Sequence, residues 1–538
     1  MKSRHPSFVV LLATVLGALI GADAAPAQVG AQFIQAGPQG PRSSLRRPVI
    51  WHVDSLATGP ANGRSWSAAF PDLQDALAQA VAGDQIWVAA GIYVPTTVGG
   101  PQSATFLVPD GVSMYGGFTG FEMFLDQRDP SMNPTILSGD INGDDQWMPS
   151  FNIVTGNSWN IVTMRDVGAG TRIDGFEFET GHLYGAPSQQ RNGAGIHLEN
   201  SSPTIAGCRF SHCVAASGGA VHADGGSPTV EGCSFHFNYA SGSTGLGGAV
   251  ASVAGDLTVL DSSFTQNTAE GVLGRGLGGA IASVSGSTLI DGCSFSWNEA
   301  LPRGGLYGNT VSLGGAVHVE SGTTTITASR FEHNVSNVGG AVSTSFFGTP
   351  VLEITSSVFV RNDAIPITTS SGFDLGAEAG AIYGSPVSRC DLAGCLVYGG
   401  TADNNGGAFV GDLGSVSSSI FWGNSDSKGT IGRSQVKARR VYHSCVMNML
   451  VGEPGEDPPD PAHFPGSISL DPMFQNAGAG DFHLLAGSPC IDAADNTAFP
   501  ASALTDIDGL ARFVDDPTVA DTGVGSGPIA DMGPHERQ

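Results

Sequence analysis

The stretch Gly218-Gly219-Ala220-Val221 decides the fold, because the chain repeats it. Each copy starts with two small residues, usually both glycine, continues with Ala or, in one copy, Gly, and ends in an aliphatic or aromatic residue. Self-similarity of this kind is the signature of a solenoid, in which each repeat is one structural turn. The block recurs at 247–250, 278–281, 314–317 and 339–342, with looser copies at 193–196, 379–382 and 406–409.

A second block follows each glycine pair and ends in an aromatic residue. In five copies the aromatic stands 16 residues after the second small residue. The position five residues earlier is always aliphatic, the position two earlier is Cys or Ser, and the position three later is Asn in most copies. The aromatics are Phe210, Phe235, Phe264, Phe295, Phe331, Phe359 and Phe421, with Val397 standing in once, and the asparagines are Asn238, Asn267, Asn298, Asn334, Asn362 and Asn424.

Constant spacing places each repeated letter at the same point of successive turns. Parallel strands then stack identical residues at about 4.8 Å, and the stacked Asn amides satisfy turn backbone that is otherwise buried and unpaired. The glycine pair allows a tight corner with positive φ. The sequence therefore predicts an all-β chain, a right-handed parallel β-helix solenoid of about a dozen rungs, with insertions at the corner between Asn and the next glycine pair.

The ends of the chain predict an exported protein with capped solenoid ends. Residues 1–27 have the basic, apolar and small-residue order of a secretory signal peptide, and 28–50 form a linker. We expect the β-helix at 51–465, including a short N-terminal capping helix within 71–82, and C-terminal rungs and a cap at 466–538. We expect the mature chain to be a monomer without a transmembrane segment, secreted or held at the cell surface.

Charge narrows the range of partners. The net charge is −26 and Lys occurs only at Lys2, Lys428 and Lys437, which excludes electrostatic binding to nucleic acid. Polyanionic ligands would also be repelled unless a cation such as Ca²⁺ bridges them. We expect a polysaccharide or a cell-surface ligand as the partner.

The Gly-Gly-Ala-Val, Cys-x-Phe and Asn pattern resembles the repeats of polymorphic outer-membrane proteins and the wider pectate-lyase-like family of right-handed β-helices. The closing elements 487–492 and Asp531-Met532-Gly533 look like the finish of secreted bacterial members. The resemblance implies the fold over nearly the whole mature chain. The lyases of that family use a carboxylate-bound Ca²⁺ and a nearby basic residue, and no Arg or Lys of this chain aligns with an acidic rung, so the resemblance does not fix an activity.

Two neighbouring repeats carry the best candidate for catalysis. His197 with Glu199, and His222 with Asp224, follow consecutive glycine pairs at equivalent positions, and alternation along a strand puts each His and its acid on one face. Stacked, the four residues could perform acid/base chemistry on a glycosidic bond or ligate a metal. The alternative is that they are ordinary polar residues of a solvated strand. His318 stands three rungs further on, too far to join them.

Asp140, Asn142, Asp144 and Asp145 place oxygen ligands around a glycine, as the start of a Ca²⁺ loop does. Phe151 occupies the twelfth place, where a closing acid is expected, so a polar turn is the alternative. Ca²⁺ is the only cofactor that the sequence suggests.

Function remains divided between two classes. The first is a secreted or surface-associated β-helix used for extracellular recognition, adhesion or structure. The alternative is a carbohydrate-active enzyme, a polysaccharide lyase or glycoside hydrolase acting on an extracellular polysaccharide. Cys208 and Cys233 on neighbouring rungs, and the local pair Cys390 and Cys395, could be disulfides or buried thiols.

Overall fold

The computed structural model describes residues 46–145, 156–182, 192–302, 311–368, 374–403, 406–430, 432–451 and 460–538. The predicted signal peptide and most of the predicted linker lie outside these residues. The segment Pro48–Gln538 forms one compact unit. Within the described residues, no helix is long and apolar enough to cross a membrane.

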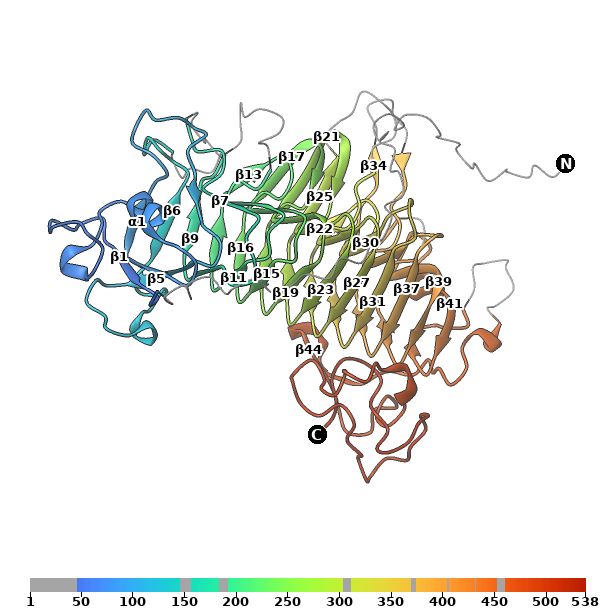
Figure 1. Cartoon of the computed structure of the whole chain (residues 1–538). Helices are drawn as coiled ribbons and strands as arrows, with labels where there is room; N and C mark the ends of the chain where they lie inside the picture. The colour runs from blue at the N-terminus through green and yellow to red at the C-terminus, as the bar shows by residue number, and fades with distance from the viewer. Residues whose placement is uncertain are drawn as a thin grey trace, which may run out of the picture. The chain divides into compact units, whose positions relative to one another are not determined.

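Successive turns of the chain stack as parallel rungs (Figure 1). One rung runs through β14 (Val221–Asp224), β15 (Thr229–Glu231), β16 (Ser234–His236) and β17 (Tyr239–Leu246). Each of these strands pairs in parallel with its equivalent in the next rung. The predicted right-handed parallel β-helix is therefore confirmed.

The strands form three long sheets. Sheet A has 22 strands in two columns. The column after the glycine pairs contains β4 (Phe106–Leu107), β7 (Val162–Arg165), β10 (Ile196–Glu199), β14, β18 (Val250–Ala254), β22 (Ile281–Ser283), β26 (Val317–Val319), β30 (Val342–Thr344) and β36 (Ile382–Gly384). The other contains β1 (Ile50–Val53), β2 (Gln85–Ala89), β5 (Ser113–Phe118), β8 (Arg172–Asp174), β11 (Thr204–Ala206), β15, β19 (Leu257–Leu260), β23 (Ser287–Asp291), β27 (Thr323–Thr327), β31 (Val351–Thr355) and β37 (Arg389–Ala393), and the long strands β39 (Phe409–Ser417) and β41 (Val436–Tyr442) span both columns.

Sheet B, with 12 strands, carries the repeated aromatics, and sheet C, with six, lies at the corner where we expected insertions. Sheet B contains β3 (Gly91–Tyr93), β6 (Thr135–Ser138), β9 (Glu177–Glu179), β12 (Arg209–Ser211), β16, β20 (Ser263–Thr265), β24 (Ser294–Ser296), β28 (Arg330–Glu332), β32 (Val358–Val360), β38 (Leu396–Tyr398), β40 (Ile420–Trp422) and β42 (Cys445–Val446). Sheet C contains β13 (Val214–Ala215), β17, β21 (Thr268–Leu277), β25 (Glu299–Pro302), β29 (Val335–Ser336) and β33 (Asp363–Ala364).

The remaining elements are short. Two antiparallel pairs stand outside the three sheets, β34 (Ile367–Thr368) with β35 (Asp374–Leu375), and β43 (Phe474–Asn476) with β44 (Asp481–Leu484). The helices are α1 (Leu73–Gln79) and α2 (Gly432–Gln435), and 3₁₀ turns lie at Trp66–Ala68, Leu125–Gln127, Pro461–His463, Ala477–Ala479 and Asn496–Ala498.

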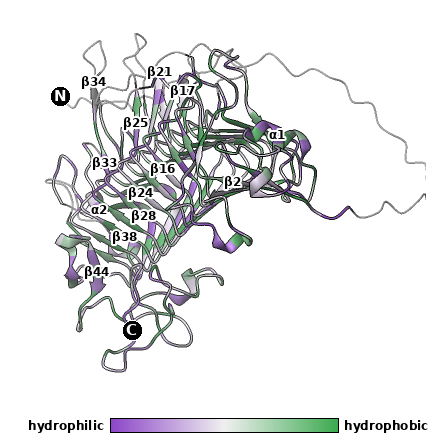
Figure 2. Ribbon diagram, turned by 90° about the vertical axis from the view of Figure 1, so that its left-hand side faces the viewer, coloured by the Kyte–Doolittle hydropathy of each residue, from purple (hydrophilic) through white to green (hydrophobic). Residues whose placement is uncertain are grey.

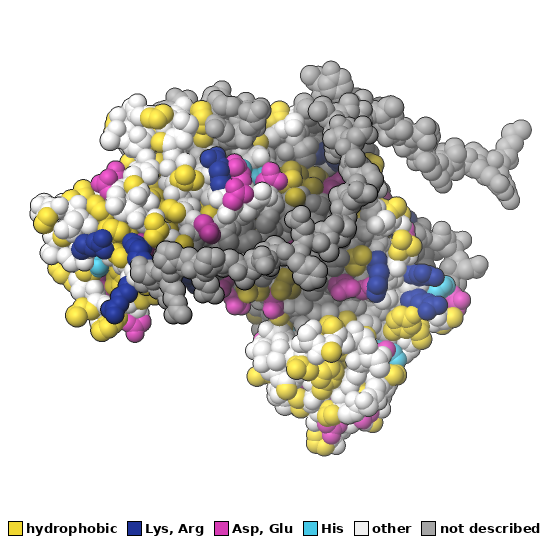
Figure 3. Space-filling model, in the orientation of Figure 1, with side chains coloured by type: hydrophobic (Ala, Val, Ile, Leu, Met, Phe, Trp, Pro, Cys, Tyr) yellow, Lys and Arg dark blue, Asp and Glu magenta, His cyan; other side chains and the backbone are white. Residues whose placement is uncertain are grey.

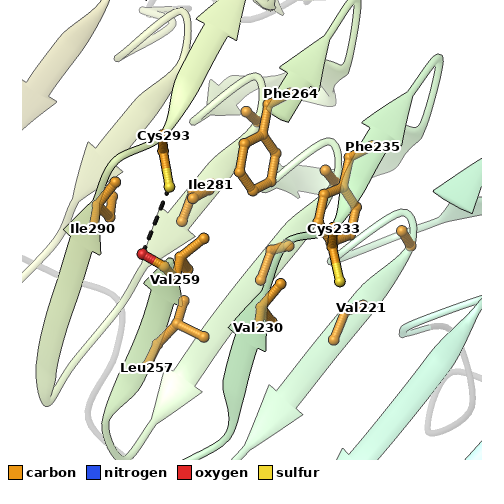
Figure 4. Packing of buried hydrophobic residues seen from close by; sticks show 14 of the residues in the cluster. Val221, Val230, Cys233, Phe235, Leu257, Val259, Phe264, Ile281, Ile290 and Cys293 are labelled. Atoms are coloured by element: carbon orange, nitrogen blue, oxygen red, sulfur yellow. Dashed lines mark hydrogen bonds between the residues drawn. The ribbon is translucent and has the colours of Figure 1, made fainter. Parts of the chain in front are cut away.

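The repeated aromatics form one column inside the solenoid. The rings of Phe235, Phe264 and Phe295 stack with centroids 4.7 and 4.8 Å apart and nearly parallel planes. The column continues to Phe178 in one direction and to Phe359 in the other. Val230, Val259 and Ile290 pack beside it, fully buried (Figure 4). Figure 2 shows the hydrophobic residues following the stacked strands.

The predicted asparagine ladder is present. The Asn298 side chain donates to the Asn334 Oδ1 at 2.9 Å and to the Phe264 carbonyl oxygen at 3.0 Å. Its own Oδ1 accepts from the backbone N–H and the side chain of Asn267, both at 3.0 Å. At the last rung Gln435 takes the place of an asparagine, because its Oε1 accepts from the Asn424 backbone and side chain.

The Cys/Ser position forms a second ladder. The Cys208 backbone N–H donates to the Cys233 Sγ, and the Cys233 N–H donates to the Ser262 Oγ. Ser and Cys alternate freely here because each offers a small buried acceptor to the rung before. The eight cysteines are free and buried, so neither Cys208 with Cys233 nor Cys390 with Cys395 forms a disulfide in this structure.

Each rung turns at residues in the left-handed region. Gly247, the first of its pair, has φ of 54°, and Ala379 adopts 57° in a looser copy. The second glycine serves a different purpose, because a Cβ on Gly248 would lie 2.1 Å from the Gly279 carbonyl oxygen of the next rung. The glycine pair therefore combines a left-handed corner with a close approach between rungs.

Both ends of the solenoid are covered. At the N-terminal end, α1 buries Leu73, Ala76 and Leu77 against β1, β2 and β4. This agrees with the expected capping helix, although the helix is shorter than the 71–82 pattern.

The C-terminal segment 466–538 differs from the rungs that we expected there. It makes one parallel bridge to the last rung, Cys445 with Ile468, and then folds back over the outer face of sheet B. This face is apolar at the last rungs and packs against the segment through Val358, Leu396, Ile420, Phe482, Ile491 and Met532.

Candidate functional site

The predicted catalytic residues lie in the expected register. β10 pairs with β14 so that His197 stands opposite His222 and Glu199 opposite Asp224. The two imidazole rings stack with centroids 5.6 Å apart. The next positions along the column are Ala251 and Ala282, which separate this pair from His318 as expected.

The two histidines are buried rather than solvated. His222 accepts or donates through Nδ1 to the Ser217 Oγ at 3.0 Å, and the His197 Nε2 lies 3.2 Å from the Glu199 Oε1. Burial, reinforced by the neighbouring His197, lowers the pKa of His222 to about 3. Burial also lowers the pKa of His197, although Glu199 opposes the shift. Both imidazoles are therefore neutral at neutral pH.

The two acids face outward and are not equivalent. Glu199 is engaged by the Arg165 Nε at 2.8 Å as well as by His197, whereas Asp224 is exposed. Arg165 of β7 stands in register with Glu199 and Asp224, so the expectation that no basic residue aligns with an acidic rung was wrong. The Glu199 carboxylate therefore has two side-chain partners, one on its own strand and one on the strand of the preceding rung. The four residues form a polar stack in which the imidazole rings lie face to face and His197 bonds Glu199, and their assignment as catalytic residues stays a prediction.

The Asp140 loop forms a self-contained turn. The Asp140 carboxylate accepts from the backbone N–H groups of Gly143, Asp144 and Asp145. The Asn142 Oδ1 accepts from the Gly99 N–H at 3.3 Å. One oxygen each of Asp140, Asp144 and Asp145 lies within 4.8 Å of the others, so the donor set can hold a hard cation. Phe151 lies outside the described residues.

A row of exposed or half-buried side chains, which we call the corner stripe, runs along the corner between sheets B and C. These residues stand two places after each core aromatic and have positive φ, so that their side chains turn outward. Neighbours stack: His212 on Phe237 at 5.5 Å and Trp297 on His333 at 4.3 Å between centroids. The corner stripe consists of His212, Phe237, Gln266, Trp297, His333 and Arg361.

Sequence reasoning missed the corner stripe. Its signal was available as aromatic, imidazole and amide residues at a constant offset from the core Phe, directly before the ladder asparagine. The residue type at this position varies from rung to rung, and only the planar shape of its side-chain group recurs.

A hollow of about 460 Å³ lies beside the corner stripe. It is bounded by Phe237 and Gln266 of the stripe and by Val214, Tyr239 and Thr268 on the outward face of sheet C, with His182 at one end. Burial lowers the pKa of His182. The hollow therefore combines two aromatic rings with neutral hydrogen-bonding groups from adjacent rungs.

A second hollow of about 420 Å³ lies between sheet A and the C-terminal segment. Its polar wall contains Arg389 paired with Asp391, whose Oδ1 also accepts from Ser415. Tyr442 and Phe499 also line it. Neither hollow includes His197, Glu199, His222 or Asp224.

These features define the class of protein: a right-handed parallel β-helix with polar and aromatic surfaces along its rungs. The family model described as "Right handed beta helix region" matches residues 150–435, more than half of the 538-residue chain. The chain belongs to this family.

Two solved structures are similar to the chain. Pectate lyase Pel9A has a TM-score of 0.42 and 15% identity, covering 92% of this chain and 98% of its own. The complex of XylC with xylose has a TM-score of 0.39 and 10% identity, covering 91% and 98%. No curated protein matches the chain. Similarities of this strength do not carry an activity from one protein to another.

Proposed function

We propose that this protein is a secreted or surface-associated β-helix that binds an uncharged extracellular polysaccharide along the corner stripe. The observation that carries the proposal is the row of outward-facing planar side chains at successive rungs, next to the hollow at Phe237 and Tyr239. Secretion follows from the predicted signal peptide and is part of the proposal.

The chemistry of the corner stripe suits sugars. A flat aromatic face packs against the apolar face of a sugar ring, and neighbouring polar groups bond its hydroxyls. The Trp297 side chain is 55% exposed. Exposure of so large an apolar side chain to water is unfavourable, and such surfaces often mark binding sites. Burial, with neighbouring His236 and Arg209, lowers the pKa of His212 to about 4, so this imidazole is neutral and can exchange hydrogen bonds with hydroxyls.

Charge supports an uncharged ligand. The net charge is −26. On the face drawn in Figure 3, acidic and basic side chains are scattered singly or in small groups. A polyanion would meet long-range repulsion, whereas a neutral chain would not. Repetition along the axis also favours a polymer, because adjacent rungs present similar groups in a line and several weak contacts add through one ligand.

Binding is tested with the mature chain on a panel of neutral and acidic polysaccharides, by affinity electrophoresis and titration calorimetry. We expect a neutral polysaccharide to bind and to quench Trp fluorescence. Trp297→Ala and Phe237→Ala should each weaken binding about tenfold, as expected when a stacked ring is removed. Phe121→Ala is the matched control, because Phe121 is 86% exposed and far from the corner stripe in the sequence.

Equal affinity of all three variants would remove the corner stripe from the proposal, and absence of binding across the panel would remove the proposal itself. The carbohydrate-active enzyme is the alternative, which predicts new reducing or unsaturated ends in the same mixtures. Such ends, if lost in Glu199→Gln and retained in Trp297→Ala, would favour the enzyme.

A further inference from the structure

The C-terminal segment contains a carboxylate that has no partner. Asp492 is fully buried, and neither of its carboxylate oxygens has a hydrogen-bond partner among the described residues. An oxygen of Asp492 lies within 4.8 Å of oxygens of Asp515 and Asp521, two exposed acids of the same segment. A buried, unpaired carboxylate facing two others is unfavourable unless a cation joins them.

Among the residues that the structure describes, no cationic side chain fills this role. Arg537 is close enough to influence Asp492, but its guanidinium pairs with Asp516. The neighbouring acid Asp531 differs from Asp492, because its oxygens accept from the backbone N–H groups of Asp492 and Arg537, both at 2.9 Å.

Backbone hydrogen bonds hold two of the three acids together. Asp492 adopts φ of 50°, and its carbonyl oxygen accepts from the N–H groups of Thr522 at 2.9 Å and Gly523 at 3.2 Å. These bonds fasten the loop that carries Asp521 directly to Asp492. The arrangement therefore exists before any ion binds, and little ordering is needed on binding.

The donor set selects the ion. All three groups are carboxylates, which suit hard cations, and no His or Cys belongs to the cluster as Zn²⁺ would favour. Asp515 and Asp521 are exposed, so water can complete a coordination shell of six to eight oxygens, as Ca²⁺ requires.

We propose that Asp492, Asp515 and Asp521 bind a calcium ion that fastens the C-terminal segment to itself where it covers the last rungs. The other two clusters differ in an informative way. The Asp140 carboxylate is satisfied by three backbone N–H groups, and Asp508 accepts from His483 and His535. Only the Asp492 cluster, among the described residues, combines nearby acids with a fully buried carboxylate lacking any partner. The inference is independent of saccharide binding.

The test uses the full mature chain, stripped of metal with EDTA and titrated with CaCl₂ or MgCl₂. We expect Ca²⁺ to raise the melting temperature progressively with concentration, to bind in calorimetry, and to slow proteolysis of the C-terminal segment. Mg²⁺ should act more weakly, because it demands a tighter octahedral shell. The double variant Asp515→Asn/Asp521→Asn alters only exposed side chains, so it should fold, melt in EDTA at or above the parent temperature, and lose the Ca²⁺-dependent rise.

Asp144→Asn is the matched control, because it removes an exposed acid from the Asp140 cluster instead. It should retain the Ca²⁺-dependent rise and the protection of the C-terminal segment. A double variant that responds to Ca²⁺ as the parent does would overturn the proposal. So would a Ca²⁺ response that disappears in Asp144→Asn, or a parent chain whose melting and proteolysis ignore Ca²⁺ at millimolar concentration.

Discussion

Asn298→Ala is the sharpest test of what holds successive rungs together. The substitution removes four side-chain hydrogen bonds, two donated and two accepted. It leaves the Asn267 backbone N–H without its acceptor and the Phe264 carbonyl oxygen without its amide donor, both in the interior. An orphaned buried group costs about 1–3 kcal/mol, so we expect the free energy of unfolding to fall by about 2–5 kcal/mol.

The assay is guanidinium unfolding followed by circular dichroism, with hydrogen exchange at the Asn267 amide as a local readout. Because solenoids unfold in parts, the midpoint of the first transition is the quantity to compare. Gln266→Ala is the control: it removes an exposed amide next to Asn267 and should change stability by less than about 0.5 kcal/mol. If Asn298→Ala unfolds at the same midpoint as Gln266→Ala, the ladder contributes no net stability and the reasoning fails.

Two further changes probe the corners and the C-terminal segment. Gly248→Ala would force a Cβ to within 2.1 Å of the Gly279 carbonyl oxygen, so it should lower the free energy of unfolding by at least about 2 kcal/mol. In the control Gly168→Ala, the added Cβ would lie 3.6 Å from its nearest neighbour and should change the free energy of unfolding little. Equal unfolding midpoints for the two variants would contradict this expectation. Burial and the neighbouring Asp531 raise the pKa of Glu536. The folded chain therefore binds the Glu536 proton more tightly than the unfolded chain does. As a result, the free energy of unfolding falls as pH rises from the ordinary carboxyl range through neutrality. Glu536→Gln should flatten that fall in melting temperature, and an unchanged pH profile would show that Glu536 does not cause it.

The rung architecture was predictable because stacking turns periodicity in the sequence into columns in space. Phe235, Phe264 and Phe295 share an offset from their glycine pairs, and that offset could only be kept if the turns superimpose. The register of His197 with His222 followed from the same argument. Its burial did not follow, because Ser217, which bonds His222, comes from the variable corner before the glycine pair.

The fold-back of the C-terminal segment was not predictable from periodicity, because that segment has no repeat. An indirect signal existed in the strands Val358–Val360 and Ile420–Trp422, which are apolar on both sides of the core aromatic. Earlier strands of sheet B, such as Ser263–Thr265, carry polar residues there. Apolar residues on both faces indicate a covered strand, but they do not reveal which part of the chain covers it. The Asp492 cluster was hidden for the same reason, since its acids meet only through loops.

The fold-back also gives the order of synthesis a physical meaning. Val358, Leu396 and Ile420 leave the ribosome well before Ile491 and Met532, the residues that cover them. Until those residues are synthesised, the incomplete chain exposes an apolar surface on the outer face of sheet B, and such a surface is prone to aggregation. Burial of this surface is therefore complete only after the C-terminal segment is synthesised, and a deletion of that segment would leave the surface exposed.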